Sequence, residues 1–132
     1  MLKKAATLVL GLWLSGPLAA QDQISPELFL DQVVGNTLTF RGHSSNNFVG
    51  VEQFLRRDLS VWATANGRCT YGQIEVRGPL ICFIYDDNPD PGNCWTPFVE
   101  DGDLVVVGVR GDIQRITSIE RRDISCEAAP LS

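Results

Sequence analysis

The four cysteines of this 132-residue chain could bind a metal, carry out thiol redox chemistry or form disulfides, and their spacing distinguishes these roles. They are Cys69, Cys82, Cys94 and Cys126. A zinc site usually brings two ligands together in a Cys-x-x-Cys pair, but the spacings here are 13, 12 and 32 residues. A thiol oxidoreductase would need the same motif. An even number of cysteines in a small domain is typical of disulfides formed in an oxidising compartment. The sequence therefore predicts two disulfides and no metal site.

Four cysteines allow three pairings, and the turn signals favour one of them. Cys82 and Cys94 flank a turn-rich segment, residues 86–93, so a disulfide between them would close a short hairpin. Cys69 would then pair with Cys126. In the chain-entropy description the two closures would stabilise the fold by about 3 and about 4 kcal/mol respectively.

His43 is the only histidine, and it is therefore the only imidazole base that a nucleophilic hydrolase could use. Ser44 and Ser45 follow it directly, but adjacent residues rarely face one another. The stretch 42–47, Gly-His-Ser-Ser-Asn-Asn, has the composition of an exposed polar loop. We therefore predict no catalytic residue.

Oxygen-bearing side chains alternate in the turn-rich segment, in the way that opens a calcium-binding loop. Asp86, Asn88 and Asp90 would supply carboxylate and amide ligands. The pattern then fails, because Pro91 stands where such a loop needs glycine and Pro97 where it needs the closing glutamate. We interpret the segment as a solvated hairpin tip, and the sequence predicts no metal and no cofactor.

Aromatic residues are spread over the β-rich part of the chain, so those that point into a barrel could line an apolar pocket. A barrel of about eight strands has an interior that side chains can just fill, or that can hold one small ligand. The sequence leaves both possibilities open. The residues that we expect to contact a ligand or a partner are Trp62, Tyr71, Phe83, Tyr85 and Trp95.

Short β-strands must position these residues. Eight segments rich in β-branched or aromatic residues are separated by turn signals such as Asn66-Gly67 and Asp101-Gly102. Before them, Ser25-Pro26 is typical of a helix start and Gly35 of a helix end. The predicted strands are 37–41, 48–55, 59–63, 69–76, 80–85, 95–100, 104–110 and 113–119. The predicted fold is mainly β: an antiparallel meander of about eight strands in a small barrel or a two-sheet sandwich, with one short N-terminal helix.

The first twenty residues have the three parts of a secretory signal peptide: Lys3 and Lys4, an apolar run, and a small-residue exit that predicts cleavage after Ala20. A membrane anchor is the alternative, but the apolar run is about ten residues long and a spanning helix needs about 20. We therefore predict a signal peptide over residues 1–20 and a single disulfide-stabilised β domain over residues 21–132. The expected location is the bacterial periplasm or the exterior, without stable membrane insertion.

The predicted mature domain is acidic. The chain has 11 lysines and arginines and 16 acidic residues, and both lysines lie in the predicted signal peptide. Residues 21–132 therefore contain nine arginines and 16 acidic residues, and their formal net charge is 9 − 16 = −7. Binding to nucleic acid needs clustered basic residues, so we expect no nucleic-acid partner.

Several stretches of the chain resemble one group of proteins. They are Gly35-Asn36-Thr37-Leu38 after the helix, residues 62–72 with Asn66-Gly67 and Cys69, Ile81-Cys82-Phe83-x-Tyr85, and Cys94-Trp95. Together they resemble small exported proteobacterial domains of unknown function with a lipocalin-like β-barrel. The resemblance covers most of residues 21–132, and it implies a fold rather than an activity.

Three functional hypotheses follow. The first is a non-enzymatic binding module that recognises a small apolar ligand or another exported protein, for instance as an inhibitor of a hydrolase or protease through loops 42–47 and 86–93. The second is a structural or envelope-associated accessory domain without a ligand pocket. The third is an enzyme that uses carboxylates alone, and its first sign would be a raised carboxyl pKa within a cleft.

Overall fold

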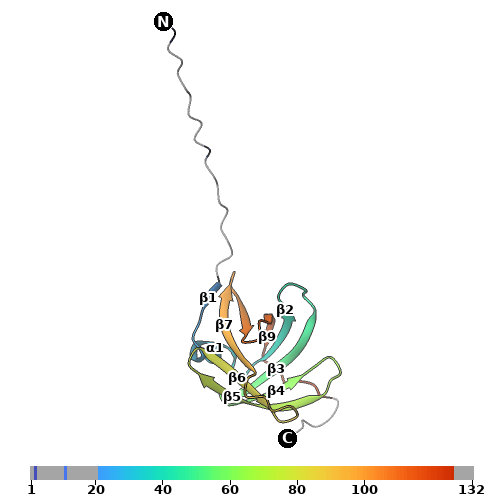
Figure 1. Cartoon of the computed structure of the whole chain (residues 1–132). Coiled ribbons are helices and arrows are strands. Elements are labelled where there is room, and N and C mark those ends of the chain that lie inside the picture. Colours follow the sequence, from blue (N-terminus) through green and yellow to red (C-terminus); the bar gives the residue numbers. More distant parts are fainter. Residues whose placement is uncertain (1, 3–10, 12–20, 127–132) are drawn as a thin grey trace.

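The computed structural model describes residues 21–126, together with Leu2 and Gly11. The rest of the predicted signal peptide, with its cleavage point, and the tail 127–132 lie outside the described residues. Figure 1 shows a small closed β-barrel with a single helix at its side. Its elements are β1 (Gln21–Gln23), α1 (Pro26–Val33), β2 (Thr37–Gly42), β3 (Phe48–Arg56), β4 (Leu59–Ala63), β5 (Cys69–Arg77), β6 (Leu80–Tyr85), β7 (Cys94–Glu100), β8 (Asp103–Gly108) and β9 (Ile113–Glu120).

Eight of the strands form the barrel, in the order β7-β6-β5-β4-β3-β2-β9-β8, and pairing of β8 with β7 closes it. All neighbours are antiparallel. The predicted mainly-β meander is confirmed, and of the two arrangements left open the structure adopts the barrel. No helix among the described residues has the length and apolar character needed to cross a membrane.

The junction between β6 and β7 is the shortest of the barrel. Only Ile81 opposite Trp95 and Cys82 opposite Cys94 are paired there. The free part of the same β7 edge is taken by β1, which places Gln21 opposite Glu100 (Figure 1). Strand β1 was not predicted from the sequence, because it has only three residues, all of them polar, and shows no strand pattern.

Helix α1 begins and ends where the sequence predicted. The Ser25 side chain accepts a hydrogen bond from the backbone N–H of Leu28 at 3.1 Å, and Pro26 occupies the first turn. The helix ends before Gly35, whose φ of +87° suits glycine. Its buried residues, Phe29 among them, join the core of the barrel. The Phe29 ring meets the Phe54 ring edge-on at 6.0 Å between centroids.

The two disulfides join Cys82 to Cys94 and Cys69 to Cys126, which is the pairing that the sequence favoured. The first crosses the short β6–β7 junction, where the two cysteines are directly opposite each other. Two disulfides indicate that the protein folds in an oxidising compartment outside the cytoplasm.

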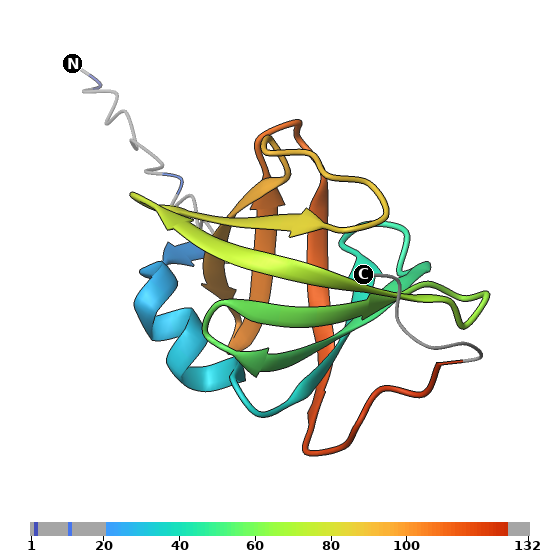
Figure 2. The same ribbon diagram turned by 90° about the horizontal axis from the view of Figure 1, so that it is seen from below.

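The second disulfide holds the segment after β9 against the outside of the barrel. Figure 2 shows this segment as the red ribbon that runs from the end of β9 toward the β4–β5 hairpin. There Ile124 and Cys126 cover a small apolar cluster built on Val61, Ala63 and Cys69. Gln53 fixes the same segment, because its side chain accepts a hydrogen bond from the Ile124 N–H at 3.0 Å. The barrel wall is therefore apolar on both faces at this place.

Candidate functional site

The barrel encloses a cavity of about 300 Å³. Its walls carry many aromatic side chains, five from four different strands and one from helix α1. The five on strands are Phe40, Trp62, Phe83, Tyr85 and Trp95, and the one on the helix is Phe29. The volume lies at the lower end of the range for small-molecule sites, so the cavity can hold one small ligand.

Glycines opposite the largest rings keep the cavity open. A Cβ atom on Gly72 would lie 2.7 Å from the Tyr85 ring and 3.0 Å from the Ser60 hydroxyl oxygen. A Cβ atom on Gly108 would lie 3.1 Å from the Trp95 ring. Because these positions carry no side chain, the rings of Tyr85 and Trp95 pack directly against the glycine backbone. The space in the middle is left free.

Replacing Gly72 with alanine is expected to lower the free energy of unfolding by about 1–3 kcal/mol, because the new methyl group displaces Tyr85 and Ser60. Urea unfolding measures the change. Gly108→Ala is the matched control. Its Cβ contact with Trp95 is looser, so it should cost less. An equal decrease in the free energy of unfolding for the two variants would contradict this account of the cavity wall.

Glu52 is the acidic residue inside the barrel. It is only 2% exposed, yet it lines the cavity. The Ser60 hydroxyl donates to its Oε1 atom at 2.5 Å, and the Tyr85 hydroxyl contacts its Oε2 atom at 2.7 Å. Burial raises the pKa of Glu52 to about 8, although the two hydrogen bonds act in the opposite direction. The carboxyl group is therefore mostly protonated at pH 7.

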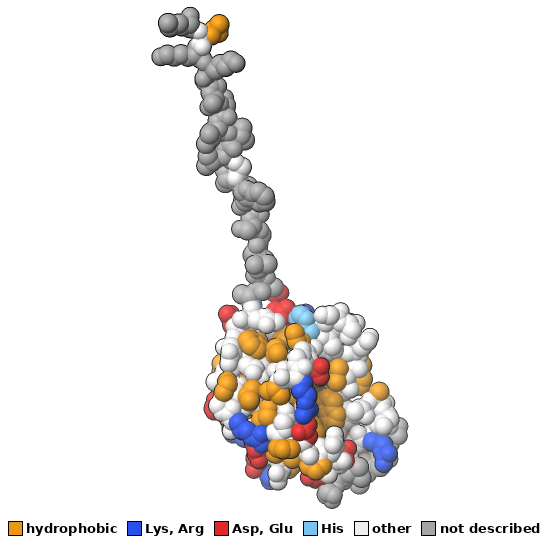
Figure 3. Space-filling model, viewed as in Figure 1, with side chains coloured by type: hydrophobic (Ala, Val, Ile, Leu, Met, Phe, Trp, Pro, Cys, Tyr) orange, Lys and Arg blue, Asp and Glu red, His pale blue; other side chains and the backbone are white. Residues whose placement is uncertain are grey.

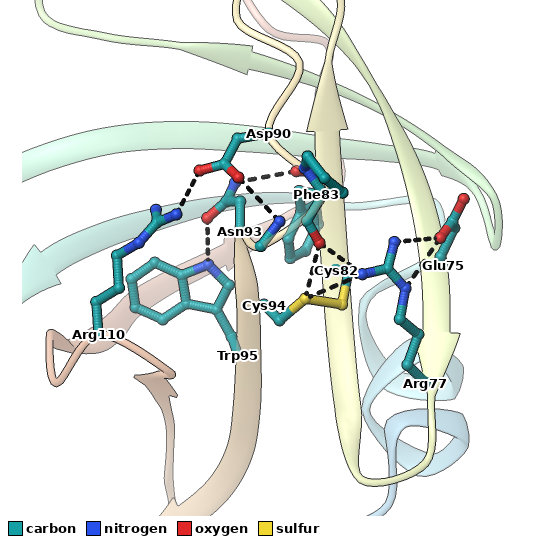
Figure 4. Close-up of a disulfide and its surroundings, with 11 residues drawn as sticks. Glu75, Arg77, Cys82, Phe83, Asp90, Asn93, Cys94, Trp95 and Arg110 are labelled. Carbon is teal, nitrogen blue, oxygen red and sulfur yellow. Dashed lines mark hydrogen bonds and ion pairs between the residues drawn. A yellow bond between two sulfur atoms is a disulfide. The ribbon is translucent and has the colours of Figure 1, made fainter.

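The rim of the cavity is polar and comes from the connections β6–β7 and β8–β9. Figure 4 shows Asp90 and Arg110 facing each other across the rim, with Nη2 and Oδ2 2.6 Å apart. Asp90 also accepts the Gly92 N–H at 2.9 Å, and the pKa of Asp90 is lowered, first of all by the hydrogen bond from Arg110. Asn93 accepts a hydrogen bond from the Trp95 indole N–H at 2.9 Å. The segment with the calcium-like pattern therefore forms one side of the entrance, next to the Cys82–Cys94 disulfide.

Four of the five predicted contact residues lie together in the cavity: Trp62, Phe83, Tyr85 and Trp95. The rings of Trp62 and Phe83 both neighbour that of Tyr85, with 6.2 Å between centroids in each pair. Tyr71 does not belong to this group. It packs on the outside of the barrel, against the small cluster covered by Cys126.

Glu52, Ser60 and Arg110 were not among the residues predicted from the sequence. A signal for Glu52 exists, because the alternation of strand residues places it on one face of β3 with Gly50 and Phe54. A carboxyl group on the same face as a core phenylalanine is unusual enough to mark a site. No comparable signal indicates Arg110, which lies in a connection between strands.

His43 begins the loop between β2 and β3, as the sequence predicted. The following loop residues, 44–47, are exposed, whereas the His43 side chain is half-buried. Its Nε2 atom lies 3.0 Å from both carboxylate oxygens of Glu100, and Arg115 Nη2 is 3.3 Å away. Hydrogen bonds from Gln21, and next from His43, lower the pKa of Glu100. The Ser45 hydroxyl accepts the Asn47 N–H instead of meeting the imidazole. On the face drawn in Figure 3, acidic and basic side chains are scattered among apolar and uncharged ones.

No protein-family model matches the chain, and searches of curated proteins and of solved structures find no match either. The assignment that the findings support is therefore structural. The protein is a closed, eight-stranded antiparallel β-barrel with one short N-terminal helix and two disulfides.

Proposed function

We propose that the protein is a non-enzymatic binding module that takes a small apolar ligand into the barrel. The observation that carries this proposal is the aromatic cavity of about 300 Å³, with its polar rim. The segment 86–93, which could have served as an inhibitor loop, supplies Asn88, Asp90 and Asn93 to this rim. Its geometry therefore supports a ligand inside the barrel over a protein partner, and it also weighs against an accessory domain without a pocket.

The proposal includes export. Cleavage after Ala20 would leave Gln21, the first residue of β1, as the new N-terminus. The two disulfides support an oxidising location, and we propose the bacterial periplasm or the exterior. The lipocalin-like family suggested by the sequence is part of the same proposal, and the closed eight-stranded barrel supports it.

The uncharged probe 2-(1-naphthyl)ethanol tests the proposal by isothermal titration calorimetry. We expect one site per barrel, and we expect Trp95→Ala to weaken binding by about tenfold, because the indole supplies a large part of the apolar wall. Tyr71→Ala is the matched control, since Tyr71 packs outside the cavity and its loss should leave the affinity unchanged. Circular dichroism checks that both variants are folded. Absence of binding to the wild-type protein would refute the proposed function.

One observation supports a second candidate function, an enzyme that uses carboxylates. Glu52 is a buried acid with a raised pKa in a cavity, which is typical of a general acid. The other carboxyl group on the cavity wall, that of Asp90, is paired with Arg110. Among the described residues that line the cavity, no second carboxyl group is therefore free to act as a base beside Glu52, so we rank binding first. Ligands recovered from the protein distinguish the two functions by mass, because a binding module returns them unchanged.

A further inference from the structure

The cavity places a carboxyl group among aromatic rings. Glu52 reaches the cavity from β3, and the hydroxyl groups of Ser60 and Tyr85 hold one oxygen atom each. A carboxylate has about four acceptor positions on its two oxygens, so positions remain for a ligand that donates hydrogen bonds. The two hydroxyl groups fix the direction of the carboxyl group before any ligand arrives.

The rings around Glu52 favour the same kind of ligand. Aromatic faces carry negative potential and attract cations, and the indole ring does so most strongly. Trp62 and Trp95 both line the cavity, together with the Tyr85 ring that is hydrogen-bonded to Glu52. A cationic group beside the Glu52 carboxylate would therefore meet a favourable potential from the walls as well.

The charge balance of the cavity excludes the opposite ligand class. The charged side chains among the described residues that line it are Glu52, Asp90 and Arg110. Arg110 pairs with Asp90 at 2.6 Å, so its charge is already compensated at the rim. An anionic ligand would find in Glu52 an interior group that is neutral at pH 7 and becomes negative, of the ligand's own sign, when it loses its proton. A cationic ligand would take the place of that proton and pair with the carboxylate.

We propose that the cavity binds a small apolar ligand that carries a protonated amine, an inference that rests on the proposed function. The ammonium group donates hydrogen bonds to the Glu52 carboxylate, and the apolar part of the ligand lies among the aromatic rings.

Binding of the amine exchanges one positive charge for another. In the free protein Glu52 holds a proton, and about nine-tenths of the molecules do so at pH 7 because burial raises its pKa to about 8. When the ammonium group arrives, the carboxyl proton leaves for the solvent and the carboxylate pairs with the amine. The affinity for the amine should therefore rise by almost tenfold per pH unit between pH 6 and 7, and level off above pH 8.

The other ionisable groups that line the cavity do not titrate in this range. Burial, and next the negative charge of Glu52, raises the pKa of Tyr85 well above its usual value. The hydrogen bond from Arg110 lowers the pKa of Asp90. A pH dependence of amine binding between pH 6 and 8 would therefore report on Glu52.

Three probes that share one naphthalene ring test the inference: 2-(1-naphthyl)ethylamine, 2-(1-naphthyl)ethanol and 1-naphthylacetate. At pH 7.5 we expect the amine to bind about tenfold or more tightly than the alcohol, and the acid to bind most weakly. Calorimetry in phosphate and in Tris buffer counts released protons. We expect about 0.9 proton per amine bound at pH 7, and none for the alcohol.

Glu52→Gln is the decisive variant, because it keeps the shape of the side chain and removes its charge. It should abolish the preference for the amine and the proton release, while the alcohol binds as before. Glu75→Gln, on the exposed side of β5, is the control and should change neither. An alcohol that binds as tightly as the amine, or an acid that binds best, would overturn the inference and leave the proposed function standing. If none of the three probes binds, the proposed function fails and takes the inference with it.

Discussion

Replacing Glu52 with glutamine is expected to make the folded protein more stable, by an amount that grows as the pH rises from 5 to 8. At pH 8 the gain should be on the order of a few kcal/mol, which would raise Tm by ten degrees or more in a domain of about this size. The glutamine amide can still accept a hydrogen bond from Ser60 and donate one to Tyr85, so the polar contacts of the site survive.

The gain follows from the proton that Glu52 holds in the folded protein. Burial raises its pKa from 4.5 to about 8, so between these values the folded state binds more protons than the unfolded state. The free energy of unfolding of the wild-type protein therefore falls by about 1.4 kcal/mol per pH unit on account of this group. The stability that the wild-type protein has with Glu52 protonated is fully present below pH 4.5 and is lost as the pH rises through 8. The pKa values of Asp90 and Glu100 are lowered, so these acids act below this range.

Urea unfolding of the two proteins at pH 5, 6, 7 and 8 measures the effect. The difference between them should widen with pH, while Glu75→Gln, which removes an exposed acid, should follow the wild-type curve. Parallel curves for wild type and Glu52→Gln would show that Glu52 is ionised in the folded protein. A protein that keeps such a costly group at its centre gives up stability for what the group does, which agrees with a role for Glu52 in binding.

Removing the Cys69–Cys126 disulfide is the second change with a large expected effect. The two cysteines are 57 residues apart, and the chain-entropy description assigns about 4 kcal/mol to such a closure. Alanine at both positions should lower the free energy of unfolding by about this amount. It should also free the segment after β9, so that Ile124 no longer covers the outer cluster around Val61.

The double variant Cys82→Ala/Cys94→Ala is the comparison. Its loop is 12 residues long, so the expected loss is about 3 kcal/mol, and the segment after β9 should stay in place. Limited proteolysis followed by mass spectrometry separates the two effects, because only the first variant should be cut after Glu120 while the barrel is still folded. Cleavage there in both variants, or in neither, would argue against the role we assign to Cys126.

The strands could be predicted because their ends are marked locally. Residues 59–63 and 80–85 form strands over the predicted ranges. Asp101 and Gly102 have φ values of 50° and 85°, as a tight two-residue hairpin requires, and the β7–β8 turn falls where this dipeptide placed it. The helix start at Ser25-Pro26 and its end before Gly35 depend on equally local chemistry.

The candidate site was harder to predict, because it depends on which face of each strand is inside. On β3 the inward residues include Gly50 and Glu52, whereas Val51 faces outward. An apolar pattern alone would place the valine inside. The outward position of Val51 is apolar because Ile124 and Cys126, more than seventy residues away, cover it. Contacts of this kind cannot be read from a window of a few residues, and the β1–β7 pairing is another example.

The three residues of β1 bear on how molecules of this protein behave toward one another. Where β6 leaves the edge of β7, unpaired N–H and C=O groups would offer a template to a strand of another molecule. Pairing of Gln21–Gln23 with Phe98–Glu100 uses these groups within one chain. Strand β1 therefore protects this edge against edge-to-edge self-association. A chain that lacks residues up to Gln23 would keep its cavity and core residues, but the edge of β7 would be unpaired and could bind a strand of another molecule.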